Sequence, residues 1–315
     1  MPDFEKAKYV SQCLELAIML EVSTSKPGNV SFSVGFEGTR VEHFLSSAVA
    51  AAPFFEEAAK RGIQALEKKI CLEEIGVGNL IKTCTSAVKD WQKGGNTLLG
   101  TTMLLIPIAA AAGMTTTKSK LDFDLNTLRR NLNDIVHSTT PQDAIDVYEA
   151  IDIAQPSGLN QAPDLDVKNK ESKDRLLKEN VTLYRVFQIA SSYDDICSEW
   201  TNNFPIIFEQ AYPYLATQLK NTNFNTSVVH TFLEILSQHP DTFIARKAGI
   251  EKAKEISTKA KEILALGGLK TPEGKHHIAT LDQELREKGN SLNPGTTADL
   301  TAATISLATL KGYRP

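Results

Sequence analysis

Four polar segments of the sequence lie where helices are expected to begin or end, and each carries residue types that apolar packing does not require. The first combines Glu21 with Lys26 and Gly28 in a loop rich in Ser and Thr. A glycine-containing loop exposes backbone N–H groups that bind phosphate, and a lysine adds positive charge. The segment indicates a phosphate site, although a helix-ending loop with a solvated lysine explains the same residues.

The second segment covers residues 94–100 and precedes an apolar stretch. Its two leading glycines allow the backbone to approach a ligand closely, and Asn96 or Thr97 can cap the helix that follows. Helix N-termini attract anions through free N–H groups and the helix dipole. A capped helix is one interpretation, and a nucleotide phosphate site is the other.

The third group of polar residues combines the pair Asp194 and Asp195 with Asp241 and Arg246. The two parts of this group belong to separate predicted helices. Magnesium prefers oxygen ligands and keeps several waters, so carboxylates near a cation suit magnesium–nucleotide chemistry. Arg246 follows Asp241 at a spacing that can place both on one helix face, where a guanidinium can bind phosphate through two hydrogen bonds. A capped helix with an Asp–Arg pair is the alternative.

The fourth segment is a turn at residues 293–299, in which Asn293 and a Pro-Gly-Thr-Thr run precede an apolar helix. Such a turn is another potential anion site. A Thr is expected to cap this helix, with Asp299 in its first turn, where the dipole alone favours a carboxylate. His276 and His277 are expected in an exposed, charged loop.

The elements that must position these segments are predicted to be helices. Apolar residues recur at spacings of three and four through most of the chain, and alternating β-branched runs are scarce. An all-α, compact multi-helix domain is therefore expected, with its polar loops converging on one nucleotide site. The predicted helices cover residues 4–21, 41–60, a stretch from 63–65 onward, 76–89, 98–112, 125–136, 143–154, 179–192, 193–202, 205–220, 226–238, 242–266 and 298–310.

The length of 315 residues is compatible with one domain over residues 1–315. A Pro-, Gly- and Asp-containing stretch at 155–175 is expected to be a surface connection or a lid over the site. The oligomeric state is left open, and a homo-oligomer is compatible with the sequence.

The net charge of −4 offers no basic field for a nucleic acid. The four cysteines form no CxxC pair, which indicates reduced thiols in a cytoplasmic protein. The N-terminal stretch is unlike a signal peptide, and the most apolar window, residues 101–114, is too short to cross a membrane.

The ordered set of segments resembles the triphosphoribosyl-dephospho-CoA synthase family, over about the whole chain. Family members have an acidic residue at a helix end followed by K-P-G, which Glu21 and residues 26–28 match. The further matches, in order, are N-T-x-x-G at 96–100, D-A-x-x-V-Y-x-A-I at 143–151, Tyr-Asp-Asp at 193–195, D-T-x-x-x-R-x-x-G at 241–249 and N-P-G-x-x-A-D-L at 293–300.

The resemblance implies an all-α fold and transfer of the triphosphoribosyl group of ATP to the 2′-hydroxyl of 3′-dephospho-CoA, or of a related phosphorylated cofactor precursor, with release of adenine. Mg²⁺ is the expected cofactor, held by Asp194, Asp195 and Asp241. General acid–base catalysis or stabilisation of an oxocarbenium-like state is assigned to Glu21 and Asp299. Binding of phosphate or ribose is assigned to Lys26, Gly28, Asn96, Thr97, Arg246 and Asn293.

Two motifs depart from the family pattern. Leu98 and Leu99 stand where members of the citrate-lyase pathway have His-Lys, and Arg40 and Glu42 stand in place of the His and Asp of G-x-H-x-D. These departures concern the acceptor more than the fold. The alternatives are a magnesium-dependent hydrolase of a nucleotide or N-glycosidic bond, and a non-catalytic helical protein that binds nucleotide.

Overall fold

The computed structural model describes residues 3–117, 123–158, 162 and 164–315. Within these residues the regular elements are helices, and the β-structure consists of one isolated bridge between Phe36 and Thr39. The all-α prediction is confirmed. The α-helices are α1 (Asp3–Ser23), α2 (Val41–Leu66), α3 (Val77–Trp91), α4 (Leu99–Met114), α5 (Leu125–His137), α6 (Pro141–Ala154), α7 (Lys170–Lys178), α8 (Leu183–Ala190), α9 (Asp195–Thr201), α10 (Tyr212–Asn221), α11 (Phe224–Gln238), α12 (Thr242–Ala248), α13 (Ile250–Ala265), α14 (Pro272–Arg286) and α15 (Gly295–Leu310). The short elements are η1 (Glu73–Ile75), the π-helix η2 (Ile206–Ala211), η3 (Gly268–Lys270) and η4 (Gly289–Leu292).

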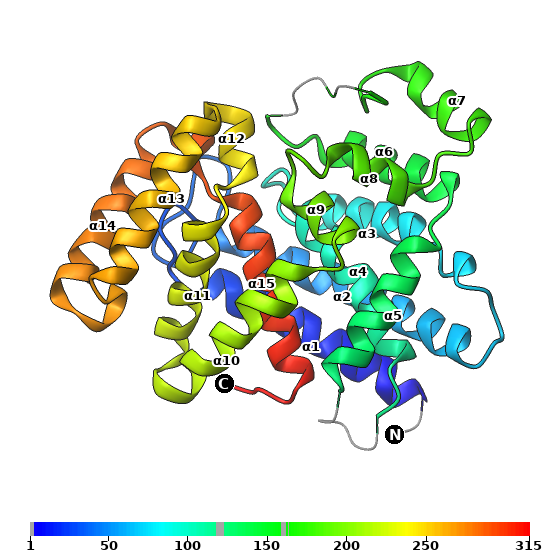
Figure 1. The fold of residues 1–315 in the computed structure, drawn as a ribbon, viewed down its shortest axis with the longest axis horizontal. Helices are drawn as coiled ribbons and strands as arrows, with labels where there is room; N and C mark the ends of the chain where they lie inside the picture. The colour runs from blue at the N-terminus through cyan, green and yellow to red at the C-terminus, as the bar shows by residue number, and fades with distance from the viewer. Residues whose placement is uncertain (1–2, 118–122, 159–161, 163) are drawn as a thin grey trace.

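The centre of the molecule is formed by α1, α2, α4 and α15, which pack on one another (Figure 1). Helix α4 is apolar around its whole circumference, and a helix of this kind is stable only when it is buried. Helix α2 approaches α4 closely because Gly62 has no side chain. A Cβ at Gly62 would lie 2.0 Å from the carbonyl oxygen of Ala110. This contact holds the C-terminal half of α4 against α2, while the first turn of α4, at the other end of the helix, forms part of the site.

Two groups of helices flank this centre (Figure 1). Helices α3 and α5 to α9 lie on one side and share the largest apolar core with α1, α2 and α4. Helices α11 to α14 lie on the other side around a second core that includes Phe232, Ile256 and Leu285. Helix α15 contacts α1, α4, α11 and α12, so its N-terminal end lies where the two groups meet. The assignment of residues 1–315 to one domain stays a prediction.

Several predicted boundaries are wrong in ways that bear on the site. The helix predicted over 242–266 is broken at Gly249, whose φ of +91° is incompatible with a continuous helix. Helix α15 begins at Gly295 with Pro294 as its N-cap residue, so Asp299 lies in the second turn and not the first. His276 and His277 are exposed as expected, but they lie on α14 and not in a loop.

The segment predicted as a connection at 155–175 contains the beginning of α7. Residues 159–161 and 163 of this segment lie outside the described residues. Among the described helices, none has the length and apolarity needed to span a bilayer.

Candidate active site

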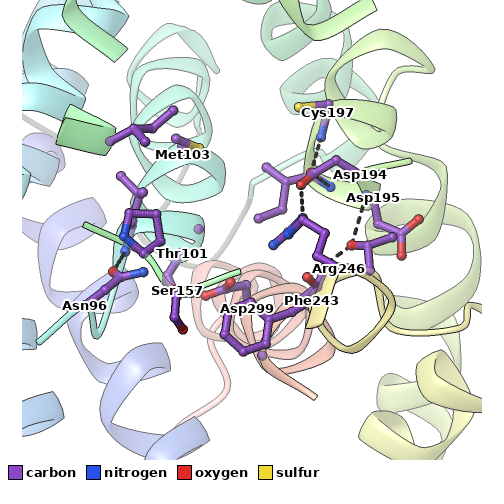
Figure 2. Close-up of a pocket in the computed structure, with 18 of the residues that line it drawn as sticks. Asn96, Thr101, Met103, Ser157, Asp194, Asp195, Cys197, Phe243, Arg246 and Asp299 are labelled. Carbon is purple, nitrogen blue, oxygen red and sulfur yellow. Dashed lines mark hydrogen bonds and ion pairs between the residues drawn. The ribbon is translucent and has the colours of Figure 1, made fainter. Parts of the chain in front are cut away.

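A cavity of about 990 Å³ opens where α1, α4, α9, α12 and α15 converge. Figure 2 shows Asn96 and Thr101 on one side, Asp194, Asp195 and Arg246 on the other, and Asp299 between the two groups. Its volume is in the range of small-molecule sites. Eight of the predicted site residues line it: Glu21, Asn96, Thr97, Asp194, Asp195, Arg246, Asn293 and Asp299.

Asp299 reaches the cavity from α15 and is held by the first turn of α4. The hydroxyl of Thr101 donates a hydrogen bond to Oδ1 of Asp299, with the two oxygens 2.5 Å apart. Gly100 makes room for this contact, because a Cβ there would lie 2.1 Å from Oδ2 of Asp299. Burial, together with the charges of Glu21 and Asp241, raises the pKa of Asp299 to about 7, while the Thr101 hydrogen bond opposes the rise. A carboxyl group with this pKa can accept or donate a proton near neutral pH.

Glu21 lies in the last turn of α1 and against Lys26. The Oε1 atom of Glu21 is 3.1 Å from the Lys26 ammonium but outside hydrogen-bond geometry. The ammonium donates instead to the backbone carbonyl of Glu21 and, at 2.7 Å, to that of Thr24. Burial raises the pKa of Glu21, and Lys26 opposes this rise. Glu21 therefore lines the cavity, whereas Lys26 is buried behind it and stabilises the C-terminal end of α1.

Asp194 and Arg246 form an ion pair on the wall opposite Asn96 (Figure 2). The Asp194 Oδ2 atom is 2.5 Å from Nη1 of Arg246, and its Oδ1 atom caps α9 by accepting from the N–H groups of Ile196 and Cys197. The guanidinium also lies over the ring of Phe243, with 5.7 Å between the Arg246 Cζ atom and the ring centroid. Arg246 is thus paired with a carboxylate that is itself fixed as a helix cap, and it is stacked on Phe243, which holds the guanidinium in one place and suits it to bind a phosphate group.

Asp195, the next residue, faces the same cavity with a carboxylate that makes no hydrogen bond or ion pair within the described part of the chain. Its backbone N–H group interacts with the hydroxyl of Thr242 at 3.4 Å. Burial and the neighbouring charges of Asp241 and Asp194 raise the pKa of Asp195 to about 7, and Arg246 opposes the rise. An available carboxylate of this kind is suited to a metal ion or a proton.

Asp241 and Gly28 do not line the cavity. Asp241 is buried, and its carboxylate accepts three hydrogen bonds: one from the N–H group of Ile244 and two from the N–H and hydroxyl groups of Thr297. It thereby ties the beginning of α12 to the beginning of α15. The N–H group of Gly28 donates to Oδ1 of Asp282 at 2.7 Å. In this structure the Asp241 carboxylate and the Gly28 N–H group are therefore hydrogen-bonded within the protein.

Three uncharged residues complete the predicted set. The Oδ1 atom of Asn96 accepts from the N–H group of Leu99 at 3.2 Å and so caps α4. The hydroxyl of Thr97 is hydrogen-bonded to that of Ser47 at 2.7 Å. The Oδ1 atom of Asn293 is buried and has no hydrogen-bond partner among the described residues, a costly arrangement that a ligand donor would relieve.

The apolar wall of the cavity was not predicted from the sequence. This wall includes Tyr148, Leu165, Phe187 and Tyr193, from α6, the 155–175 segment and the α8–α9 region. It gives the cavity one polar and one apolar part. Tyr148 and Phe187 occupy core-like positions on α6 and α8, so periodicity could not separate them from ordinary core residues. Leu165 and Tyr193 lie between helices, where helical periodicity does not apply.

Thr101 was also missed as a site residue, although it directly follows the glycine of the N-T-x-x-G segment. Leu98 and Leu99, which replace the His-Lys of the family pattern, are largely buried at the cavity edge. Within the described residues no group of three or more His, Cys, Asp or Glu side chains is arranged to hold a metal ion. Magnesium usually takes one or two protein carboxylates and completes its shell with phosphate and water, so the metal assignment stays a prediction.

The fold and the cavity together define a helical protein with an acidic site for a small molecule. Residues 7–315 match the family model described as ATP:dephospho-CoA triphosphoribosyl transferase, and the chain belongs to this family. The predicted family is confirmed.

Curated relatives match shorter stretches. A protein of Malonomonas rubra named "Probable 2-(5''-triphosphoribosyl)-3'-dephosphocoenzyme-A synthase" is 30% identical over 130 residues, which is 41% of this chain and 40% of the relative. A protein of the same name from Citrobacter koseri is 29% identical over 33% of this chain and 34% of the relative. The chain thus spans between a third and two fifths of the length of these relatives.

A crystal structure from Archaeoglobus fulgidus, described as a candidate triphosphoribosyl-dephospho-CoA synthase, has a similar fold. Its TM-score is 0.61 at 22% identity, and the alignment covers 86% of this chain and 100% of that one. At this identity the likeness supports the fold alone.

Proposed function

We propose that this protein transfers the triphosphoribosyl group of ATP to the 2′-hydroxyl of 3′-dephospho-CoA and releases adenine. The observation that carries this proposal is the position of Asp299, which lies between the Asp194–Arg246 pair and the first turn of α4 in a cavity of about 990 Å³. The family match over residues 7–315 supports the same reaction.

The reaction breaks the bond between C1′ of the ATP ribose and N9 of adenine, and it forms a bond between C1′ and the acceptor oxygen. The acceptor hydroxyl loses one proton, and the departing adenine takes up one. Asp299, whose pKa is raised to about 7, is suited to take the proton from the hydroxyl. Glu21, whose charge contributes to the raised pKa of Asp299, also lines the cavity and adds negative charge that stabilises an oxocarbenium-like centre.

Arg246 is proposed to bind the triphosphate. Asp195, whose carboxylate has no partner within the described residues, and Asp194 are proposed to hold Mg²⁺. When bound, this ion offsets phosphate charge next to the acidic wall. Asn96 and Asn293 supply hydrogen-bonding groups for ribose or phosphate oxygens. The four cysteines are free thiols, which fits the proposed location in the cytoplasm.

The test is chromatographic detection of adenine from ATP and Mg²⁺, with and without 3′-dephospho-CoA. Transfer predicts adenine release that depends on the acceptor. Release without any acceptor, together with ribose triphosphate, would identify a hydrolase instead. Binding of Mg-ATP with no release in the presence of dephospho-CoA would favour the non-catalytic alternative.

A further inference from the structure

A second cavity, of about 400 Å³, lies next to the main one. The two cavities share Gln155 and the turn formed by residues 95–99, so this turn is a wall common to both. The rest of its lining comes from the second half of α3 and the two residues that follow it, from Thr102 of α4 and from the end of α6. A ligand that lies over the edge of this turn can therefore contact residues of both cavities.

The charges of the two cavities are opposite. Among the described residues that line the main cavity, Arg246 is the single cation, and six are acidic: Glu21, Asp164, Asp166, Asp194, Asp195 and Asp299. The described lining of the second cavity contains no acidic residue and two lysines, Lys89 and Lys93. Anions are therefore disfavoured over most of the main cavity and favoured in the second.

Both lysines are available for a ligand. Within the described part of the chain, neither ammonium makes an ion pair or a hydrogen bond with another residue. Lys89 lies in the last turn of α3, where the helix dipole favours a cation on its own. The dipole does not account for Lys93, which lies two residues beyond the end of α3 and lines the same cavity.

We infer that the cavity lined by Lys89 and Lys93 binds the diphosphate group of the acceptor. This inference rests on the proposed function, in which two polyanionic substrates meet and Arg246 is engaged by the triphosphate of ATP. The acceptor hydroxyl must approach Asp299, while its diphosphate must avoid the acidic wall. An acceptor that lies over the edge of the shared turn places its ribose in the main cavity and its diphosphate beside Lys89 and Lys93.

The first test labels the lysines of the wild-type protein with an amine-acetylating reagent, and mass spectrometry measures the extent at each site. We expect 3′-dephospho-CoA to lower the labelling of Lys89 and Lys93 several-fold, whereas pantetheine, which lacks phosphate, leaves it unchanged. Lys8 and Lys261, which are solvent-exposed, serve as internal controls. Equal labelling of Lys89 and Lys93 with and without dephospho-CoA would overturn the inference.

The second test compares the double variant Lys89→Gln, Lys93→Gln with Lys8→Gln, Lys261→Gln, which removes the same charge elsewhere. The first variant is expected to raise KM for dephospho-CoA on the order of tenfold or more, and the control is expected to keep the wild-type value. The same KM in all three proteins would overturn the inference while leaving transfer intact. Protection of the two lysines without adenine release would instead support the inference and count against the proposed reaction.

Discussion

Thr101 and Asp299 are 198 positions apart in the sequence, yet the hydroxyl of Thr101 donates a hydrogen bond of 2.5 Å to the carboxylate of Asp299. This bond joins the beginning of α4 to the second turn of α15. It places the proposed catalytic carboxylate at the junction of the two groups of helices. Because the hydroxyl stabilises the charged form of the carboxylate, it also holds down a pKa that burial raises.

The Thr101→Val variant is expected to raise the pKa of Asp299 further, because the carboxylate loses its hydroxyl donor. If Asp299 is the base, kcat/KM rises with pH as this group ionises, and the acidic limb of the profile moves to higher pH by on the order of one pH unit. Thr102→Val is the matched control, since the Thr102 hydroxyl donates to the carbonyl of Leu99 and does not contact Asp299. An acidic limb that stays in place in the Thr101 variant would contradict this role.

The Asp299→Asn variant is expected to lower kcat/KM by roughly 10²–10⁴-fold, the usual contribution of a general base. It should also change the pH dependence of stability. Between the ordinary carboxyl pKa of 3.8 and the folded value of about 7, the folded chain holds a proton that the unfolded chain has released. The free energy of unfolding therefore falls as pH rises through this window.

Urea unfolding at pH 5 and pH 8 measures this effect. The wild type should lose more stability between the two pH values than Asp299→Asn, which has no carboxyl to titrate. Equal losses in the two proteins would show that the pKa of Asp299 is not raised in the folded state.

Asp195 and Asp241 should respond differently to the same substitution. Asp195→Asn is expected to weaken magnesium-dependent activity with little loss of stability, because its carboxylate has no partner within the described residues. Asp241→Asn should destabilise the fold by about 2–4 kcal/mol, since a buried acceptor of three hydrogen bonds is altered. Magnesium titration of activity tests the expected role of Asp195, and thermal unfolding of each variant compares the two losses of stability. A strong stability loss in Asp195→Asn would remove it from the metal assignment.

Arg246→Lys keeps the positive charge but loses the planar set of donors. It is expected to raise KM for ATP on the order of tenfold, and Arg246→Gln should raise it further. Steady-state kinetics at saturating acceptor measures both values. If Arg246→Lys keeps the wild-type KM for ATP, the guanidinium does not bind the triphosphate.

Gly100→Ala is expected to displace Asp299, because the new Cβ would lie 2.1 Å from Oδ2 of that residue. The variant should lose about 1–3 kcal/mol of stability and most of its activity. Gly295→Ala is the control in the first turn of another helix, where the Cβ would meet only Phe243 at an ordinary 3.5 Å. Equal activity in both variants would show that the close approach of α4 to α15 does not matter.

The helices and the convergence of polar segments were predictable from the sequence because both depend on local patterns. Apolar spacing located α1, α4 and α11 to within a few residues, and eight of the predicted residues line one cavity. The helix predicted to end at residue 60 instead continues as α2 to Leu66. The break at Gly249 was missed because a glycine inside a periodic stretch interrupts a helix only when its φ is positive, as it is here.

The partner of each polar side chain could not be predicted, since it depends on contacts distant in sequence. Lys26 was expected to bind phosphate, yet its ammonium donates to the backbone carbonyls of Glu21, in the last turn of α1, and of Thr24. Asp241 was expected to bind magnesium, yet its carboxylate is used by Ile244 and Thr297. The site assignments of these residues stay predictions that the variants above can decide.

The central claim is tested most directly by measuring adenine release from ATP and Mg²⁺ with and without 3′-dephospho-CoA, in the wild type and in Asp299→Asn. Triphosphoribosyl transfer predicts release in the wild type only when dephospho-CoA is present, and a loss of roughly 10²–10⁴-fold in the variant. Release that is independent of dephospho-CoA, or equal in the two proteins, would contradict the proposed reaction or the role of Asp299 in it.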